Sequence, residues 1–169
     1  MLFRSARIVD TRKTTPTLRL FERYAVRCGG GFNHRYSLSD AMLVKDNHLA
    51  VLAASGRHDL TAALQQARRD LPHTAHLEVE VDTPAQIDAV LDAEVDTILL
   101  DNFTPVQLQA AVAHIRQRSP HTLIEASGNV RLDSVRAIAE TGVDLISAGA
   151  LTHSPRALDL GLDILPAGS

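Results

Sequence analysis

The chain is poor in the residues on which small secreted and membrane-spanning proteins depend. Among its 169 residues there is one cysteine, no tryptophan and an aromatic fraction of 4%. The single Cys28 excludes an internal disulfide and fits a reducing compartment. No apolar stretch approaches the roughly 18 residues of a membrane span, and the start of the chain is too short and too charged for a signal peptide. We therefore expect a cytoplasmic protein without a membrane partner.

Aliphatic residues must fill the interior in place of aromatic ones. The chain is 45% hydrophobic and 22% charged, and no linker or low-complexity tract interrupts it. A globular chain of this size can bury a sizeable core, so we expect residues 1–169 to form one domain.

The two parts of the sequence carry opposite net charge. Residues 1–45 hold nine Lys and Arg against three Asp and Glu, whereas residues 46–169 hold eight against seventeen. The basic residues of the first part lie beside glycine and histidine, without the interleaved aromatic residues on which nucleic-acid bases stack. This pattern favours a pocket for a small polyanion over a nucleic-acid partner.

Six short β-like runs alternate with helical patterns along the chain. The runs are Ala6–Val9, Ala41–Val44, Leu77–Val81, Thr97–Leu100, Thr122–Glu125 and Asp144–Ser147. The helical patterns include Leu60–Ala67, Ala85–Leu91, Val106–Ile115 and Leu132–Ala139. This alternation predicts parallel strands joined by crossover helices, hence an α/β barrel or an open doubly wound sheet.

Polar side chains or glycines lie at the end of nearly every predicted strand. They are Arg12-Lys13, Lys45, Glu80, Asp101, Ser127-Gly128 and Gly149. In a barrel the carboxyl ends of all strands meet at one face, where barrel enzymes build their sites. An open sheet, with strands about 4.8 Å apart, would spread the same groups over roughly 25 Å. We therefore predict an α/β barrel of about six parallel strands with crossover helices.

Six motifs occur in the order typical of one known family. They are ARIVDTRKTTP, YAVRCGGGFNHRYSLSDAMLVKDNH, EVEVD, ILLDNF, EASGN and ISAGALTHS. Together they resemble the barrel domain of the quinolinate phosphoribosyltransferases, also called carboxylating nicotinate-nucleotide pyrophosphorylases. The resemblance runs from about residue 6 to residue 164, and the combination of TRKT, GGGxNHR and KDNH is highly specific.

The resemblance implies an enzyme of NAD biosynthesis. Members of the family transfer the phosphoribosyl group of phosphoribosyl pyrophosphate to quinolinate, giving nicotinate mononucleotide, pyrophosphate and carbon dioxide, with Mg²⁺ as cofactor. The resemblance also implies an incomplete barrel with fewer than eight strands and a homodimer. Family members normally carry an N-terminal sandwich domain before the barrel; because this chain lacks such a region, we expect it to be a fragment.

The resemblance also assigns roles to individual residues. Those expected to bind quinolinate are Arg12, His34, Arg35 and Lys45. Those expected in catalysis are Lys13, at the junction of the two substrates, and Glu80 and Asp101, which hold the ribose hydroxyls and Mg²⁺. Those expected around the 5′-phosphate are Ser127, Gly128, Asn129, Ala148, Gly149 and His153.

These residue types suit the chemistry. Quinolinate carries two carboxylates, which planar arginine side chains bind in a bidentate manner. Departure of pyrophosphate leaves a cationic sugar carbon, which carboxylates stabilise. Strand alternation places Glu78, Glu80 and Asp82 on one face, where a buried polar surface is costly unless it serves a ligand. The alkylated pyridine ring accepts the electrons released on decarboxylation, so no protein nucleophile, Cys28 included, is expected.

Simpler interpretations compete with these roles. The Arg12-Lys13 pair could be solvated, and Asp101 could be a helix cap. Asn129 stands where many members have glycine, but asparagine tolerates a positive φ and we expect the turn to be retained. Two other functions stay open: a related phosphoribosyltransferase that uses another aromatic base, against which the intact NHR and KDNH motifs argue, and a non-catalytic barrel remnant. An exposed apolar flank would favour the remnant.

Overall fold

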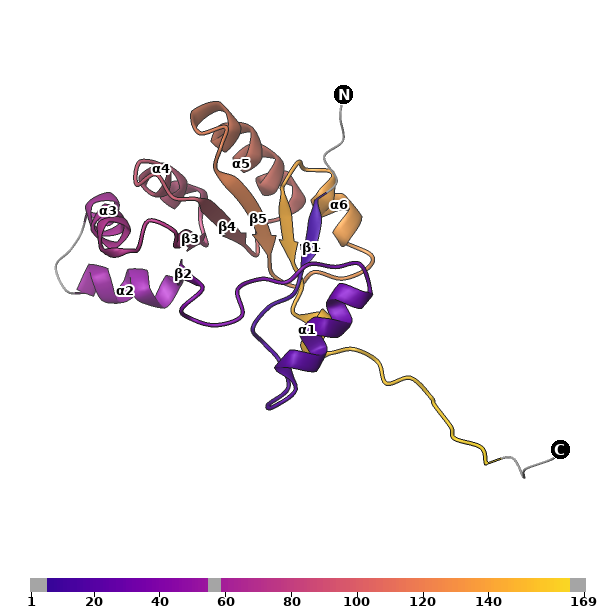
Figure 1. The fold of residues 1–169 in the computed structure, drawn as a ribbon. Coiled ribbons are helices and arrows are strands. Elements are labelled where there is room, and N and C mark those ends of the chain that lie inside the picture. Colours follow the sequence, from indigo (N-terminus) through magenta and orange to yellow (C-terminus); the bar gives the residue numbers. More distant parts are fainter. Residues whose placement is uncertain (1–5, 55–58, 165–169) are drawn as a thin grey trace.

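A computed structural model describes residues 6–54 and 59–164 (Figure 1). Its six strands form one sheet in which every pair is parallel. The strands are β1 (Arg7–Val9), β2 (Ala41–Val44), β3 (His76–Val81), β4 (Thr97–Asp101), β5 (Leu123–Ser127) and β6 (Leu145–Ser147). All six coincide with the β-like runs of the sequence to within one or two residues, which confirms that part of the prediction.

The strand order identifies an incomplete barrel. The order in the sheet is β1-β6-β5-β4-β3-β2, so each strand from β2 onward pairs with the next in the chain and β6 pairs with β1. A doubly wound sheet would instead reverse direction at a central switch point. Only a β1–β2 pairing is missing among the described strands, and this gap is the seam of the barrel. The predicted fold class, an incomplete α/β barrel, is confirmed.

The segment after Gly31 occupies the seam. Phe32 forms an isolated parallel bridge with Val9 of β1. Three residues later, Nη1 of Arg35 donates a hydrogen bond to the carbonyl of Ala41 in β2 at 2.8 Å. Backbone and side-chain contacts thus connect the two edge strands where no strand ladder does.

The described helices are α1 (Arg19–Cys28), α2 (Asp46–Ala54), α3 (Leu60–Asp70), α4 (Ile87–Leu91) after the short 3-10 turn η1 (Pro84–Gln86), α5 (Pro105–Arg118), α6 (Val135–Ala139) and α7 (Ala150–His153). Helices α3, α4, α5 and α6 lie along one side of the sheet, and α1 lies below the strands in this view and contacts α7 (Figure 1). The predicted helix over Leu132–Ala139 begins three residues later, and Leu132 is exposed. No helix in the described ranges has both the length and the apolar character needed to cross a membrane.

Strand alternation divides the sheet into an apolar outer face and a polar inner face. Val79, Ile98 and Ile124 are buried in the hydrophobic core that the sheet shares with the helices. Their neighbours in sequence, such as Glu78 and Glu125, project from the other face and are buried as well. Because burying carboxylates is costly unless they are paired or bind a ligand, the inner face is where a site is expected.

Arginine–aspartate pairs brace the amino-terminal ends of two strands. Asp96, just before β4, accepts hydrogen bonds from Arg68 of α3 and from the backbone amide of Leu77. Asp144, just before β6, does the same with Arg116 of α5 at 2.5 Å and the amide of Ile124 at 2.8 Å. In both cases the carboxylate has its donors within the protein.

Candidate active site at the carboxyl ends of the strands

Three of the four residues predicted to bind quinolinate line one cavity. Arg12 follows β1, Arg35 lies in the seam and Lys45 follows β2, and together with His48 they line a cavity of about 550 Å³. The described lining contains no carboxylate. The cavity is therefore suited to a ligand with more than one negative charge.

The two arginines of this cavity are close enough to repel each other. Burial, and then the charge of Arg12, lower the pKa of the Arg35 guanidinium. Nε of Arg12 is shielded from solvent and has no hydrogen-bond partner among the described residues. A buried donor without an acceptor is costly, so an anion bound here would supply what this arginine lacks.

A cluster of carboxylates adjoins the cation cavity at Lys45. Glu80, Asp82 and Asp101 each offer an oxygen, and these oxygens lie within 4.8 Å of one another. Glu80 also forms an ion pair with Lys45. Burial raises the pKa of the Glu80 carboxyl, although Lys45 opposes the shift. Carboxylate oxygens are the ligands that Mg²⁺ prefers, so these three residues fit the cation expected from the sequence.

Asp101 does not cap a helix, which was the simpler interpretation of this residue from the sequence. The N-cap of α5 is Thr104, whose hydroxyl accepts from the amide of Gln107 in a capping box. Asp101 instead accepts a hydrogen bond from the side chain of Asn102 at 2.6 Å. Because the helix is capped without it, the carboxylate of Asp101 is available for a ligand.

The loop after β5 is held against the loop after β4. The amide of Asn102 donates to the carbonyl of Ser127 at 2.9 Å, and a Cβ on Gly128 would lie 2.2 Å from Oδ1 of Asn102. Gly128 has a φ of +99°, and Asn129 also has a positive φ of +48°. The expectation that asparagine retains the turn is confirmed. Only glycine fits at position 128, which lets the two loops approach closely.

The loop after β6 contacts the loop that carries Lys13. Thr152 of α7 donates to the carbonyl of Lys13 at 2.7 Å. Within the β6 loop, His153 lies so close that a Cβ on Gly149 would be 2.8 Å from its Nε2. Ala148 is buried beneath this loop, and the side chain of Lys13 is exposed. Two segments more than a hundred residues apart in the chain thus meet beside the mouth of the barrel.

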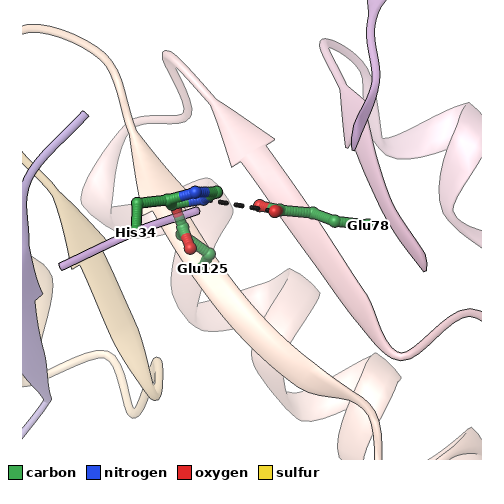
Figure 2. Close-up of side chains that lie close together, drawn as sticks. All are labelled: His34, Glu78 and Glu125. Atoms are coloured by element: carbon green, nitrogen blue, oxygen red, sulfur yellow. Dashed lines mark ion pairs between the residues drawn. The ribbon is translucent and has the colours of Figure 1, made fainter. Parts of the chain in front are cut away.

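His34 lies in a second cavity, next to the cation cavity. This cavity has a volume of about 420 Å³ and shares Arg35 and Ala41 with the first. The imidazole is directed at two buried carboxylates, with Nε2 at 3.2 Å from Glu78 and 3.6 Å from Glu125 (Figure 2). His34 therefore shares a cavity with Arg35 but does not line the cavity of Arg12 and Lys45, and its contact with quinolinate stays a prediction.

The charges of this cluster shift one another's pKa values. Burial, and then the charge of Glu78, raise the pKa of Glu125 to about 7. Burial lowers the pKa of His34, but Glu78 and Glu125 outweigh it and the net shift is upward. One oxygen on each glutamate has no hydrogen-bond partner among the described residues.

The His34 cluster is better suited to a proton than to a metal ion. Its three ligand atoms are near enough to one another to hold a metal. However, Nδ1 of His34 accepts a hydrogen bond from the amide of Arg35 at 2.8 Å, which leaves the ring proton on Nε2, the nitrogen that faces the carboxylates. A nitrogen that carries a proton donates hydrogen bonds and does not ligate a metal.

Three residues of the site received no direct role from the sequence. Glu125 gave no signal because only the fold brings it near His34. His48 belongs to the KDNH motif, and its Nδ1 accepts from the amide of Lys45 at 2.9 Å. Asp82 was visible only through its alternation with Glu80, and the structure shows that it joins the carboxylate cluster.

The fold and the residues at its strand ends together define a class: an α/β barrel that gathers cationic and acidic side chains after its strands. Residues 3–163 match the family described as quinolinate phosphoribosyl transferase, C-terminal domain. The chain belongs to this family, as the motifs of the sequence predicted.

Relatives and solved structures agree with this assignment. The chain is 49% identical over 159 residues to a nicotinate-nucleotide pyrophosphorylase [carboxylating] of Mycobacterium leprae, covering 94% of this chain and 54% of the relative. It superimposes on NadC from Streptococcus pyogenes with a TM-score of 0.78 at 44% identity, covering 89% of this chain and 50% of that one. A NadC deletion mutant gives 0.81 at 44% identity, covering 92% and 52%. The chain thus spans about half the length of these proteins.

Proposed function

We propose that this chain is the barrel part of an enzyme that transfers the phosphoribosyl group of phosphoribosyl pyrophosphate to quinolinate, with loss of carbon dioxide. The observation that carries the proposal is the cavity lined by Arg12, Arg35 and Lys45, with the unpartnered Nε of Arg12. Two arginines and a lysine match the two carboxylates of quinolinate in charge.

The sugar phosphate would occupy the neighbouring part of the same face. The loops at Ser127–Asn129 and Ala148–Gly149 bring backbone close together without bulky side chains, which suits a 5′-phosphate. Lys13 lies beside the second of these loops and would contact the phosphoribosyl group. His153 packs on Gly149 and would complete the phosphate site.

The chemistry needs orientation and charge more than a reactive side chain. The pyridine nitrogen attacks the sugar carbon as pyrophosphate departs, and Glu80 and Asp101 would stabilise the positive charge that develops there. Glu80, Asp82 and Asp101 would hold Mg²⁺, which when bound neutralises phosphate charge. The bond from the ring carbon to the carboxylate then breaks as carbon dioxide leaves, the adjacent positive ring nitrogen stabilises the electron pair that stays on that carbon, and a proton from water takes the place of the carboxylate.

The same proposal includes a homodimer in the cytoplasm. Helix α1 exposes Leu20, Phe21 and Tyr24, each more than 60% accessible. An apolar helix face of this kind is typical of a surface that packs against a neighbour. The neighbour would be a second copy or the rest of a longer chain; a non-catalytic remnant would expose the same face, and the turnover assay below distinguishes the two.

Product analysis of the full-length protein tests the proposal. With quinolinate, phosphoribosyl pyrophosphate and Mg²⁺, we expect equal amounts of nicotinate mononucleotide, pyrophosphate and carbon dioxide. Nicotinate in place of quinolinate serves as the control, because it lacks the second carboxylate. Turnover of nicotinate or another aromatic base in preference to quinolinate would favour the related phosphoribosyltransferase. Absence of turnover with every base, in a folded protein that binds quinolinate, would favour a remnant.

A further inference from the structure

Asp10 is a completely buried carboxylate to which the reaction assigns no role. It lies at the end of β1, two residues before Arg12, and its exposed fraction is 0%. A buried carboxylate is tolerated only where hydrogen-bond donors surround it. Asp10 has three such donors among the described residues. One is Arg23 of α1, and the other two are Asn33 and His34 of the seam.

The donors to Asp10 fix the segment that carries His34 and Arg35. Oδ1 accepts from the backbone amide of His34 at 2.8 Å and from Nη1 of Arg23 at 3.1 Å. Oδ2 accepts from the side chain of Asn33 at 2.6 Å. The carboxylate thus holds two consecutive residues of the seam, one through its side chain and one through its backbone.

Arg23 of α1 holds the same segment from the other side. Its Nη2 donates to the carbonyl of His34 at 2.5 Å, and its Nη1 also reaches the carbonyl of Arg35 at 3.3 Å. Asn33 in turn donates to the carbonyl of Arg23 at 3.0 Å. Arg23 is itself 7% exposed, so these bonds form away from solvent, where they are strong.

This network has a direct consequence for the cation cavity. Arg12 follows Asp10 by two residues and Arg35 follows His34 by one, so the network sets the separation between the backbone positions from which the two arginine side chains extend. The two groups repel each other across the cavity. Without a rigid connection, the backbone could relax to increase their separation, and a site for two adjacent carboxylates would lose its geometry.

We propose that Asp10 and Arg23 are a positioning pair that sets the carboxylate-binding geometry of the cation cavity. The proposal rests on the proposed function, because it identifies quinolinate as the substrate whose binding depends on the pair. Neither residue needs to touch the substrate. Their effect is transmitted through the backbone of the His34-Arg35 segment and through the start of the loop at Arg12.

The test is a comparison of two KM values in the full-length protein. For Asp10→Asn we expect KM for quinolinate to rise at least tenfold, and KM for phosphoribosyl pyrophosphate to change by less than twofold. Arg23→Lys keeps the charge but loses the fork that reaches two carbonyls, so we expect a smaller change in the same direction. Calorimetric titration with quinolinate should show the same weakening.

Asp144→Asn is the matched control. Asp144 also accepts from an arginine and from a backbone amide, but at the opposite end of the barrel. We expect this variant to lower the melting temperature and leave the ratio of the two KM values unchanged. A purely structural role for Asp10 would give the same result as the control.

The outcomes distinguish a failure of the positioning role from a failure of the proposed function. If the wild type converts quinolinate and folded Asp10→Asn keeps both KM values, or raises both equally, the positioning role is wrong and the proposed function stands. A wild type that neither binds nor converts quinolinate overturns both. If Asp10→Asn does not fold, Arg23→Lys and Asn33→Ala are measured in its place. At least one of them should raise KM for quinolinate more than KM for phosphoribosyl pyrophosphate, and if neither does so the positioning role is wrong.

Discussion

The charged side chains at the two ends of the barrel differ in whether they have partners within the protein. At the amino-terminal end, Asp96 and Asp144 each have an arginine and a backbone amide as donors. At the carboxyl end, Arg12 has an unpartnered nitrogen and Arg35 lies near a like charge. Among the described residues, the two aspartates of the first end have their donors, whereas at the second end Lys45 is paired with Glu80 but Nε of Arg12 has no acceptor.

This difference predicts which charges contribute mainly to stability and which contribute mainly to ligand binding. Paired charges at the amino-terminal end fasten helices to strands, so removing one should lower stability. Unpaired charges at the carboxyl end raise the free energy of the folded state until an anion binds, so removing one should affect ligand binding first. Strain and like-charge contacts of this kind concentrate at functional sites.

The largest expected effect concerns Glu125, which lies between the two ends. Its pKa of about 7 in the folded protein is above its ordinary value of 4.5, so the folded state holds a proton more tightly than the unfolded state. Its contribution to stability is therefore complete below pH 4.5 and is lost as the pH rises through 7. The loss is on the order of 3 kcal/mol. Denaturant unfolding at pH 5 and pH 8 measures it.

Glu125→Gln isolates this contribution. Glutamine keeps the shape of the side chain but does not titrate, so the fall in stability between pH 5 and pH 8 should become smaller in the variant. His34, whose pKa is also raised, contributes in the same direction just above pH 6.5 and remains in both proteins. An equal fall in wild type and variant would show that Glu125 is ionised in the folded protein.

Arg35→Ala tests the carboxyl end. Loss of a charge-assisted partner should cost about 2 kcal/mol in quinolinate recognition, or roughly 30-fold in kcat/KM. The substitution removes the hydrogen bond to Ala41 across the seam but also relieves repulsion with Arg12, so thermal stability should change less than quinolinate recognition. Steady-state kinetics and a melting curve measure the two effects. Unchanged kinetics would remove Arg35 from the site.

Asp144→Asn tests the amino-terminal end and should give the opposite pattern. The side chain of Asp144 is 12% exposed and that of its partner Arg116 is 31% exposed, so the loss should be about 1.5 kcal/mol of unfolding free energy. kcat/KM for quinolinate should stay within twofold of the wild type. A large loss of activity in a folded variant would contradict the division between the two ends.

Thr104→Ala is the mildest change and separates structure from function within the carboxyl end. Loss of the N-cap of α5 should cost about 1 kcal/mol of stability, with activity retained. Asp101→Asn should do the reverse, because that carboxylate caps nothing. Denaturant titration and turnover of both variants check the pair, and similar profiles for the two would argue against a separate role for Asp101.

The periodic part of the fold was predictable from the sequence. Strands such as Thr97–Asp101 are short apolar runs between helical patterns, and the parallel arrangement explains why residues at strand ends converge. Lys45, Glu80 and Asp101 were found in this way, and the structure brings them together. Local sequence patterns suffice to predict this part of the fold because each strand–helix crossover repeats the same unit.

The seam could not be predicted, because it depends on contacts without a period. Helix α1 was not singled out, since its large apolar residues are exposed while Arg23 is buried. Arg23 is inside only because Asp10 and two carbonyls receive its hydrogen bonds. The position of His34 follows from the same network, because Asp10 and Arg23 both bind the His34 backbone. A carboxylate thirteen residues from its arginine leaves no signature in hydrophobic periodicity.

At the seam, the distance between β1 and β2 can vary from one sequence to another. Elsewhere the circumference is fixed by ladders of backbone hydrogen bonds, whose spacing no substitution can change. Between β1 and β2 the width depends on how far the Arg35 side chain reaches to the carbonyl of Ala41. Substitutions there can change the distance between the two edge strands while every strand pair stays intact.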